Sequence, residues 1–211
     1  MDPGGGTGGS TAPLVPGWKT VIHPERGIAS DVPGDWAVKS SGWVTHVAEN
    51  GGPAPEETPL VGFAAPAVLK EKWCRSDDDG NGTREDTPPA SVGFRAEPDA
   101  RDTAEAAREN ARLRVYGSLR PAVEGEGHHR AAKPFTAESG LTGRVATAAS
   151  AGVDGTGRCT HDGTATGFAF ENPAGETLSR TFVGVRGVDD EVPEPTVRKI
   201  IGTVRLVESA P

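Results

Sequence analysis

The sequence predicts an α+β fold, in which an antiparallel β-sheet carries one long helix and one short C-terminal helix. Most apolar segments are short and are separated by turns rich in Gly and Pro, which is the pattern of hairpin strands. Two segments have helical periodicity instead. Because strands and helices do not alternate along the chain, a doubly wound parallel sheet is not expected.

The N-terminal part of the chain has the pattern of a series of short strands. Pro24–Gly27 is a turn between two apolar segments, so Trp18–His23 and Ile28–Val32 are expected to pair as a hairpin. Further strands are expected at Trp36–Val38, Trp43–Val47, Leu60–Leu69 and Ser91–Ala96. The polar segment between the last two, Arg75–Ala90, is expected to be an exposed loop.

The long helix is expected at about Asp99–Leu119, a segment rich in Ala, Glu and Arg. Asp99 or Asp102 can cap its N-terminus. Small side chains recur at spacings of three and four, at Ala104, Ala107, Ala111 and Val115. This narrow face of small residues would let the helix lie close to a sheet.

Two more hairpins are expected in the C-terminal half. A single glycine separates Pro134–Ser139 from Leu141–Ala149, and the turn Asn172–Gly175 separates Thr164–Phe170 from Thr177–Val185.

The chain then closes with an amphipathic segment, Pro195–Val204. Its apolar side chains follow the i, i+3, i+4, i+7 pattern at Val197, Ile200, Ile201 and Val204. Proline suits the first turn of such a helix.

Length and composition predict one domain with a tail. A chain of 211 residues is long enough for one hydrophobic core. Its 29 Gly and 18 Pro together make up a share of the residues that is just below the range of about 25–30% typical of low-complexity disorder, so we expect a fold with many turns. Residues 1–17 contain little to bury and are expected to be a flexible tail or linker, followed by a single globular domain at 18–208.

The net charge of −8 disfavours broad binding to phosphate backbones or to anionic membranes. Nucleic acid is therefore not an expected partner. No apolar stretch approaches the roughly 18 residues that span a bilayer. Met1 is the single methionine, and it precedes a spacer-like Gly/Pro segment, which is typical of a domain cut from a longer precursor. Contact with the membrane is expected only through an anchor upstream of Met1.

Cys74 and Cys159, the two cysteines, have three interpretations: a disulfide, two unrelated thiols, or one catalytic nucleophile. A bridge between positions 85 residues apart would stabilise the fold by about 4–5 kcal/mol, and it would place the domain in an oxidising compartment. His161 is too near Cys159 in an extended segment to act easily as its base. The disulfide is the preferred interpretation.

Asp77–Gly82 matches the first half of a calcium-binding loop, with Asp77, Asp79 and Asn81 as the candidate ligands. The match then fails, because position twelve of the loop is Pro88 and not the usual bidentate Glu. A solvated acidic turn is therefore preferred. Calcium is the one cofactor that the sequence leaves open.

The remaining candidates have structural interpretations. His128 and His129 are adjacent in a Gly-rich loop, where their side chains rarely converge on a metal. The aromatic residues Trp18, Trp36, Trp43, Trp73 and Tyr116 could line a ligand groove, but core packing explains them equally well and is preferred. No phosphate loop, dinucleotide fingerprint or nucleophile elbow is present, so no catalytic residue is assigned.

Several short motifs occur in a fixed order along the chain: Gly17-Trp18-Lys19, Pro24–Ile28, Val32–Trp36, Val61-Gly62-Phe63, Lys72-Trp73-Cys74, Lys133-Pro134-Phe135, Ser139-Gly140-Leu141, Asp190–Pro193 and Val197–Ile201. Through them the chain resembles an uncharacterised domain family of actinobacterial membrane-anchored and lipoprotein-type proteins. This resemblance implies an extracytoplasmic compartment and brings no activity. The chain is also similar to PsbP-like domains, through its Val-Pro-Gly-x-Trp motif and its C-terminal helix. That similarity implies an α/β/α sandwich and a non-catalytic binding or assembly role.

We therefore expect a non-enzymatic extracytoplasmic domain, membrane-tethered or secreted, that binds an envelope protein or a small ligand. Two alternatives remain open at this stage. One is a hydrolase whose site residues are distant in sequence. The other is an extracellular module stabilised by calcium at the Asp77 loop.

Overall fold

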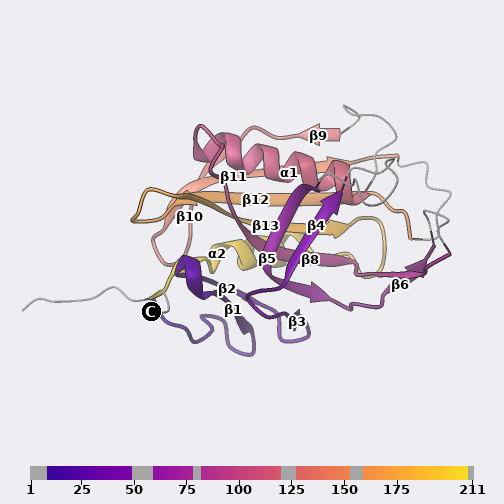
Figure 1. The fold of residues 1–211 in the computed structure, drawn as a ribbon, viewed down its shortest axis with the longest axis horizontal. Coiled ribbons are helices and arrows are strands. Elements are labelled where there is room, and N and C mark those ends of the chain that lie inside the picture. Colours follow the sequence, from indigo (N-terminus) through magenta and orange to yellow (C-terminus); the bar gives the residue numbers. More distant parts are fainter. Residues whose placement is uncertain (1–8, 49–58, 78–81, 120–126, 153–158, 209–211) are drawn as a thin grey trace, which may run out of the picture.

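An antiparallel sheet of nine strands organises the protein, as the computed structural model in Figure 1 shows. The structure describes residues 9–48, 59–77, 82–119, 127–152 and 159–208. The main strand order is β10 (Lys133–Thr136), β11 (Thr142–Ser150), β12 (Gly163–Glu171), β13 (Thr177–Val185), β8 (Ala90–Ala96), β5 (Pro59–Leu69) and β3 (Ala37–Val38). Two further strands join it: β9 (Gly127–His129) pairs with β11, and β4 (Val44–Ala48) pairs with β5. The predicted α+β class is confirmed.

The long helix α1 (Thr103–Leu119) begins four residues after the start of the expected segment. Asp102 is its N-terminal cap, because the Glu105 backbone N–H donates to the Asp102 carboxylate at 2.7 Å. This bond satisfies one of the free N–H groups of the first turn.

Helix α1 covers one face of the sheet, over β11, β12 and β13 (Figure 1). Most of its small face is buried as predicted, with Ala107, Ala111 and Val115 almost inaccessible to solvent, but Ala104 is only half-buried. The approach is so close that a Cβ added at Gly167 of β12 would lie 2.9 Å from the Ala107 carbonyl oxygen. Small residues on both elements therefore set the spacing between the helix and the sheet.

The opposite face is covered by a second sheet and by helix α2 (Glu194–Gly202). The second sheet has the order β1 (Lys19–His23), β2 (Ile28–Val32) and β14 (Arg205–Leu206), and the 3-10 turn η1 (Pro24–Arg26) joins its first two strands. The main core lies between this cover and the large sheet. Its largest apolar members are Ile28, Trp36, Phe94, Phe168, Phe170, Leu178, Phe182, Ile200 and Ile201.

A small hairpin, β6 (Cys74–Ser76) and β7 (Glu85–Thr87), occupies part of the segment that the sequence predicts to be a loop. The Cys74–Cys159 disulfide ties this hairpin to the residues that precede β12, with a Cα–Cα distance of 5.7 Å. The preferred interpretation of the two cysteines is confirmed. The loop prediction was wrong at these strands, because their residues are polar and lack an apolar face.

Part of the segment expected to be a tail contacts the domain. Residues 1–8 lie outside the described residues, but the segment from Ser10 to Val15 contacts the domain. Val15 is buried at 8% exposure, and the Leu14 backbone N–H donates to Asp31 at 2.6 Å. The contacts come from residues that are distant in sequence, so local composition did not reveal them. Among the described residues, no helix has the length and apolar character needed to cross a membrane.

Candidate functional site

A cavity of about 250 Å³ lies between the two sheets and is the candidate site; we call it the intersheet cavity. One wall is the β1–β2 hairpin, through His23, Arg26 and Ile28. The other wall is formed by β5 and β8, including Phe94, and by Leu178 of β13. The hairpin and the strands β5, β8 and β13 therefore position the lining residues from four separate parts of the chain.

The lining combines apolar side chains with basic ones. His23 and Arg26 are joined by Arg95, and no acidic residue is among the described residues that line the cavity. The His23 Nδ1 atom is buried and has no hydrogen-bond partner in the described part of the chain. Burial lowers the pKa of His23 below its ordinary value, which favours the neutral ring. Arg26 forms an exposed ion pair with Glu176 at 2.8 Å.

Arg180, on β13, lies beside this cavity in the core. Its side chain is fully buried, and its guanidinium carbon is 4.2 Å from the centre of the Phe94 ring. None of its Nε, Nη1 and Nη2 atoms has a hydrogen-bond partner among the described residues. Burial lowers the pKa of Arg180 to about 9, while the Asp31 charge acts in the opposite direction. An unpaired buried charge costs several kcal/mol, so this arginine is the strongest electrostatic anomaly beside the cavity.

Two larger hollows are lined by described residues that have no buried, unpartnered polar atom. One, of about 650 Å³, lies near the β12–β13 turn and is lined by Arg144, Glu171 and Asn172 among others. The second, of about 560 Å³, lies beside Ser139 and Leu206. None of the residues that line either hollow has a buried polar atom without a partner. The intersheet cavity is the better candidate for this reason.

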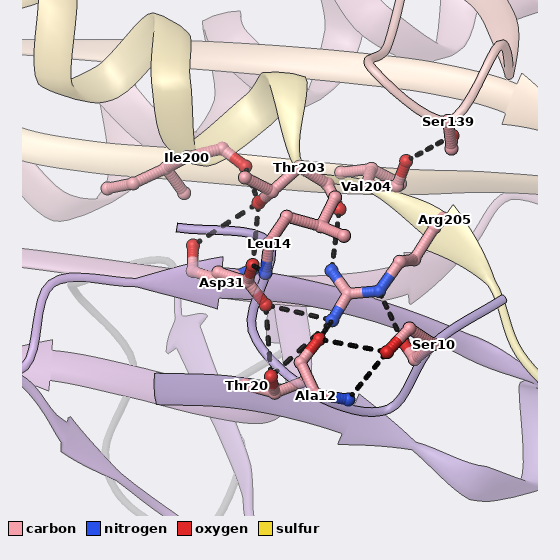
Figure 2. Close-up of polar contacts among 10 residues, drawn as sticks. All are labelled: Ser10, Ala12, Leu14, Thr20, Asp31, Ser139, Ile200, Thr203, Val204 and Arg205. Atoms are coloured by element: carbon pink, nitrogen blue, oxygen red, sulfur yellow. Dashed lines mark hydrogen bonds and ion pairs between the residues drawn. The ribbon is translucent and has the colours of Figure 1, made fainter. Parts of the chain in front are cut away.

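A second buried arginine, Arg205, differs from Arg180 because its guanidinium nitrogens are hydrogen-bonded (Figure 2). Its Nε donates to the Ser10 carbonyl at 2.6 Å and its Nη1 to the Thr203 carbonyl at 2.9 Å. Its Nη2 donates to the Ala12 carbonyl at 3.0 Å and to the Asp31 carboxylate at 2.9 Å. This residue therefore fastens the N-terminal segment to the small sheet.

The carboxylate of Asp31 is equally well satisfied. Besides Arg205, it accepts hydrogen bonds from the Leu14 backbone N–H and from the Thr20 hydroxyl, at 2.6 and 3.1 Å. The Asp31 backbone N–H donates to the Thr203 hydroxyl at 2.8 Å. We name Asp31 and Arg205 the buried ion pair, and we interpret it as a structural anchor because its polar groups are already engaged.

Another polar cluster lies beneath α1. Glu97 accepts hydrogen bonds from the Asn110 amide and the Ser179 hydroxyl, both at 2.6 Å. The Arg114 guanidinium carbon lies 3.2 Å from the centre of the Phe63 ring. Burial lowers the pKa of Arg114 to about 9, with the like charge of Arg95 adding to the effect. Glu97, Asn110 and Ser179 are therefore a structural contact between helix and sheet. The Arg114 Nε and Nη2 atoms are buried and have no hydrogen-bond partner among the described residues, so Arg114 is a second unpaired buried arginine in addition to Arg180.

The disulfide excludes the nucleophile interpretation of Cys159, because the Cys159 sulfur is bonded to Cys74. The His161 ring packs against Trp73, with ring centres 5.3 Å apart. The Trp73 indole N–H donates to Asp190 at 2.8 Å. These contacts pack the disulfide region against the loop before α2.

The calcium prediction falls largely outside the described residues. Asp79 and Asn81 lie outside them, and Asp77 accepts a hydrogen bond from the Gly82 backbone N–H at 3.0 Å. Among the residues that the structure does describe, no group of three or more His, Cys, Asp or Glu side chains could hold a metal ion. His128 and His129 are in β9, but their side chains are not among the described ones.

The four tryptophans have different environments. Trp36 is a core residue at 2% exposure and packs against Phe182, as the preferred interpretation predicts. Trp43 is 52% exposed beneath the Lys39 ammonium group, so the preferred core interpretation was wrong for this residue. Trp18 lies under Lys199, and Trp73 packs against His161. The four tryptophans therefore have separate partners among the described residues, and the side chain of Tyr116, the fifth aromatic candidate, lies outside them.

Sequence reasoning missed Arg180, although a signal was available. In a strand, residues two apart share a face, so Leu178, Arg180 and Phe182 point the same way. The two flanking residues are apolar and buried. The position of Arg180 between them therefore indicates that its charged side chain is also buried.

Two solved structures are similar to the chain at low scores. The Ran-binding protein Mog1p of Saccharomyces cerevisiae is 12% identical with a TM-score of 0.45, and the match covers 90% of this chain and 96% of that one. A protein from Bacteroides thetaiotaomicron VPI-5482 is 8% identical with a TM-score of 0.33, covering 91% and 49% respectively. Both TM-scores are below 0.5, a similarity too low to assign a function.

No curated protein sequence matches the chain. A family of domains of unknown function, DUF8017, matches residues 11–209, which is nearly the whole chain. The chain therefore belongs to the DUF8017 family of domains of unknown function.

Proposed function

We propose that this domain is a non-enzymatic binding module that works outside the cytoplasm, at the cell envelope. The observation that supports this compartment is the Cys74–Cys159 disulfide. Structural disulfides persist in oxidising compartments and are rare in the cytosol. The resemblance to actinobacterial membrane-anchored and lipoprotein-type proteins agrees with this assignment.

The polar groups favour binding over catalysis. A nucleophile is usually activated by a base that hydrogen-bonds to it, and a third group orients that base. The His23 Nδ1 atom has no such partner among the described residues. The buried carboxylates of Asp31 and Glu97 instead hold neighbouring segments in place. The intersheet cavity is the proposed binding site, for a small ligand or for a side chain of an envelope protein.

The compartment can be tested by trapping the thiols in cells of the native host. Cells would be quenched in acid, and the protein alkylated with a maleimide–polyethylene glycol reagent with and without prior reduction. We expect no mass shift without reduction and two tags after it. A Cys159→Ser variant is the matched control, because its free Cys74 must take one tag without reduction. Two tags on unreduced wild-type protein would contradict the proposal.

A further inference from the structure

Three arginines line one recess between α1 and β11, apart from the intersheet cavity. Arg108 and Arg112 belong to α1, and Arg130 follows β9, which pairs with β11 (Figure 1). The recess has a volume of about 200 Å³, and Glu109 is the one acidic residue among the described residues that line it. We call Arg108, Arg112 and Arg130 the arginine cluster.

Regular structure fixes the backbone of each member of the cluster. Arg108 and Arg112 are four residues apart in α1, so their side chains lie on the same face of the helix. The Arg130 backbone N–H donates to the Thr147 carbonyl at 3.1 Å, which holds Arg130 beside β11. The alanines of α1 and β11 that form the floor are buried. A ligand would therefore contact the arginine side chains rather than the floor.

Two of the three charges are not neutralised within the described part of the chain. Arg112 donates to Glu109 at 2.9 Å. Arg108 and Arg130 are exposed, and neither forms an ion pair or a side-chain hydrogen bond with another described residue. The charge of Arg108 reaches Glu105, but that carboxylate is already bound by Arg101 at 2.7 Å. Like charges four residues apart destabilise a helix, so a bound anion would relieve this arrangement.

The local charge of the recess is opposite to that of the whole chain. Its described lining carries a net charge of +2, whereas the chain carries −8. At physiological ionic strength, charges more than about 8 Å away are largely screened, so the arginine cluster determines what binds in the recess. A long polyanion would also meet the acidic surface around it and be repelled. The recess therefore suits one compact anionic group.

We infer that the arginine cluster binds a single phosphate group. The planar donor fork of a guanidinium matches two phosphate oxygens at once, and the tetrahedral group has oxygens for more than one fork. A carboxylate has two oxygens and one charge, so it would leave part of the cluster without a partner. A soluble phosphoester and a lipid headgroup both supply a phosphate. The net charge of −8 disfavours approach to an anionic membrane, so the soluble phosphoester is the expected source.

The inference can be tested by titrating ¹⁵N-labelled protein with glycerol phosphate and with acetate at constant ionic strength, and by sedimenting it with phosphatidylglycerol vesicles. We expect glycerol phosphate to shift saturably the amide signals of residues 108–112, 130 and 146–148. Acetate should bind about tenfold more weakly, since it forms fewer charge-assisted hydrogen bonds. Vesicles should leave the protein in solution; co-sedimentation that requires Arg108 and Arg130 would identify the lipid headgroup as the source. Equal binding of acetate, or binding of neither phosphate probe, would overturn the inference.

Variants separate the site from the overall charge. Arg108→Gln and Arg130→Gln should each weaken phosphate binding about tenfold, and their unfolding midpoints should not fall, because both side chains are exposed and unpaired. Arg108→Lys should retain part of the affinity, since it keeps the charge and loses the fork. Arg144→Gln is the matched control: Arg144 is also exposed, on β11, but it lines a different hollow, so its loss should leave the affinity unchanged.

If Arg108→Gln and Arg130→Gln both bind phosphate like the wild type, the inference is wrong. It is also wrong if Arg144→Gln weakens binding equally, because net charge and not the recess would then attract the anion. The arginine cluster is a site beyond the proposed function and depends neither on the intersheet cavity nor on the compartment. Failure of phosphate to bind would leave the thiol-trapping result intact, and free thiols in cells would leave the cluster intact.

Discussion

Replacing Arg205 with methionine should destabilise the domain by about 3–5 kcal/mol, because it breaks a buried ion pair from one side. Arg205 is 2% exposed and Asp31 is fully buried. The substitution removes the donors to the Ser10, Ala12 and Thr203 carbonyls. It also leaves the Asp31 carboxylate charged in the interior without its cation.

Equilibrium unfolding in urea can measure this loss. With a slope of about 1–3 kcal/mol/M, a loss of this size moves the midpoint by about 1 M or more. In the double variant Asp31→Asn/Arg205→Met, the total loss should be smaller than the sum of the two single losses, since the contacting partners share one interaction. Arg101→Met is the matched control: its pair with Glu105 is exposed, so the midpoint should barely change.

An Arg205→Met protein that unfolds at the wild-type midpoint with an unchanged slope would refute this reasoning. The urea midpoint of Arg205→Lys should lie between those of the wild type and of Arg205→Met, because lysine keeps the charge and loses the planar set of donors. A lysine variant as unstable as the methionine variant would show that hydrogen-bond geometry alone accounts for the effect.

Three further predictions address other parts of the molecule. The double cysteine-to-serine variant should lose about 4–5 kcal/mol in the same urea assay, since the bridge closes a loop of 85 residues; a loss below about 1 kcal/mol would contradict it. Burial lowers the pKa of His23, so the stability that depends on a neutral His23 ring is fully present above about pH 6.5 and is lost as the pH falls through the lowered pKa of the folded protein. His23→Gln should flatten this pH dependence, and NMR titration of His23 should give a pKa below about 6.5. Gly93→Ala should destabilise the protein by about 1–3 kcal/mol, because the new Cβ would overlap the Phe63 side chain, whereas Gly42→Ala, which meets no atom within 4 Å, should have no such cost in calorimetry.

The sequence was sufficient to predict the local elements. Alternating patterns and turn residues located the β1–β2 and β12–β13 hairpins, and the small-residue spacing gave the buried face of α1. These features depend on neighbours within a few residues. The same holds for the Asp102 cap, whose partner is three positions away.

The contacts that the sequence did not reveal join distant residues. Asp31 and Arg205 are 174 positions apart, and neither has a local pattern that indicates burial. The segment from Ser10 to Val15 has the composition of a linker, yet it is held by those two side chains. The intersheet cavity likewise combines the β1–β2 hairpin with β5, β8 and β13, so that only the arrangement of the sheets brings its lining together.

The Arg205 contacts bring the first and last parts of the described chain to the same place. Gly9 approaches the Leu206 carbonyl so closely that a side chain at position 9 would overlap it. A mechanical pull applied through the residues before Gly9 would therefore load the Arg205 hydrogen bonds first. Those few bonds would yield before the nine-stranded sheet is stretched, so the segment could peel away under tension while the rest of the domain keeps its shape.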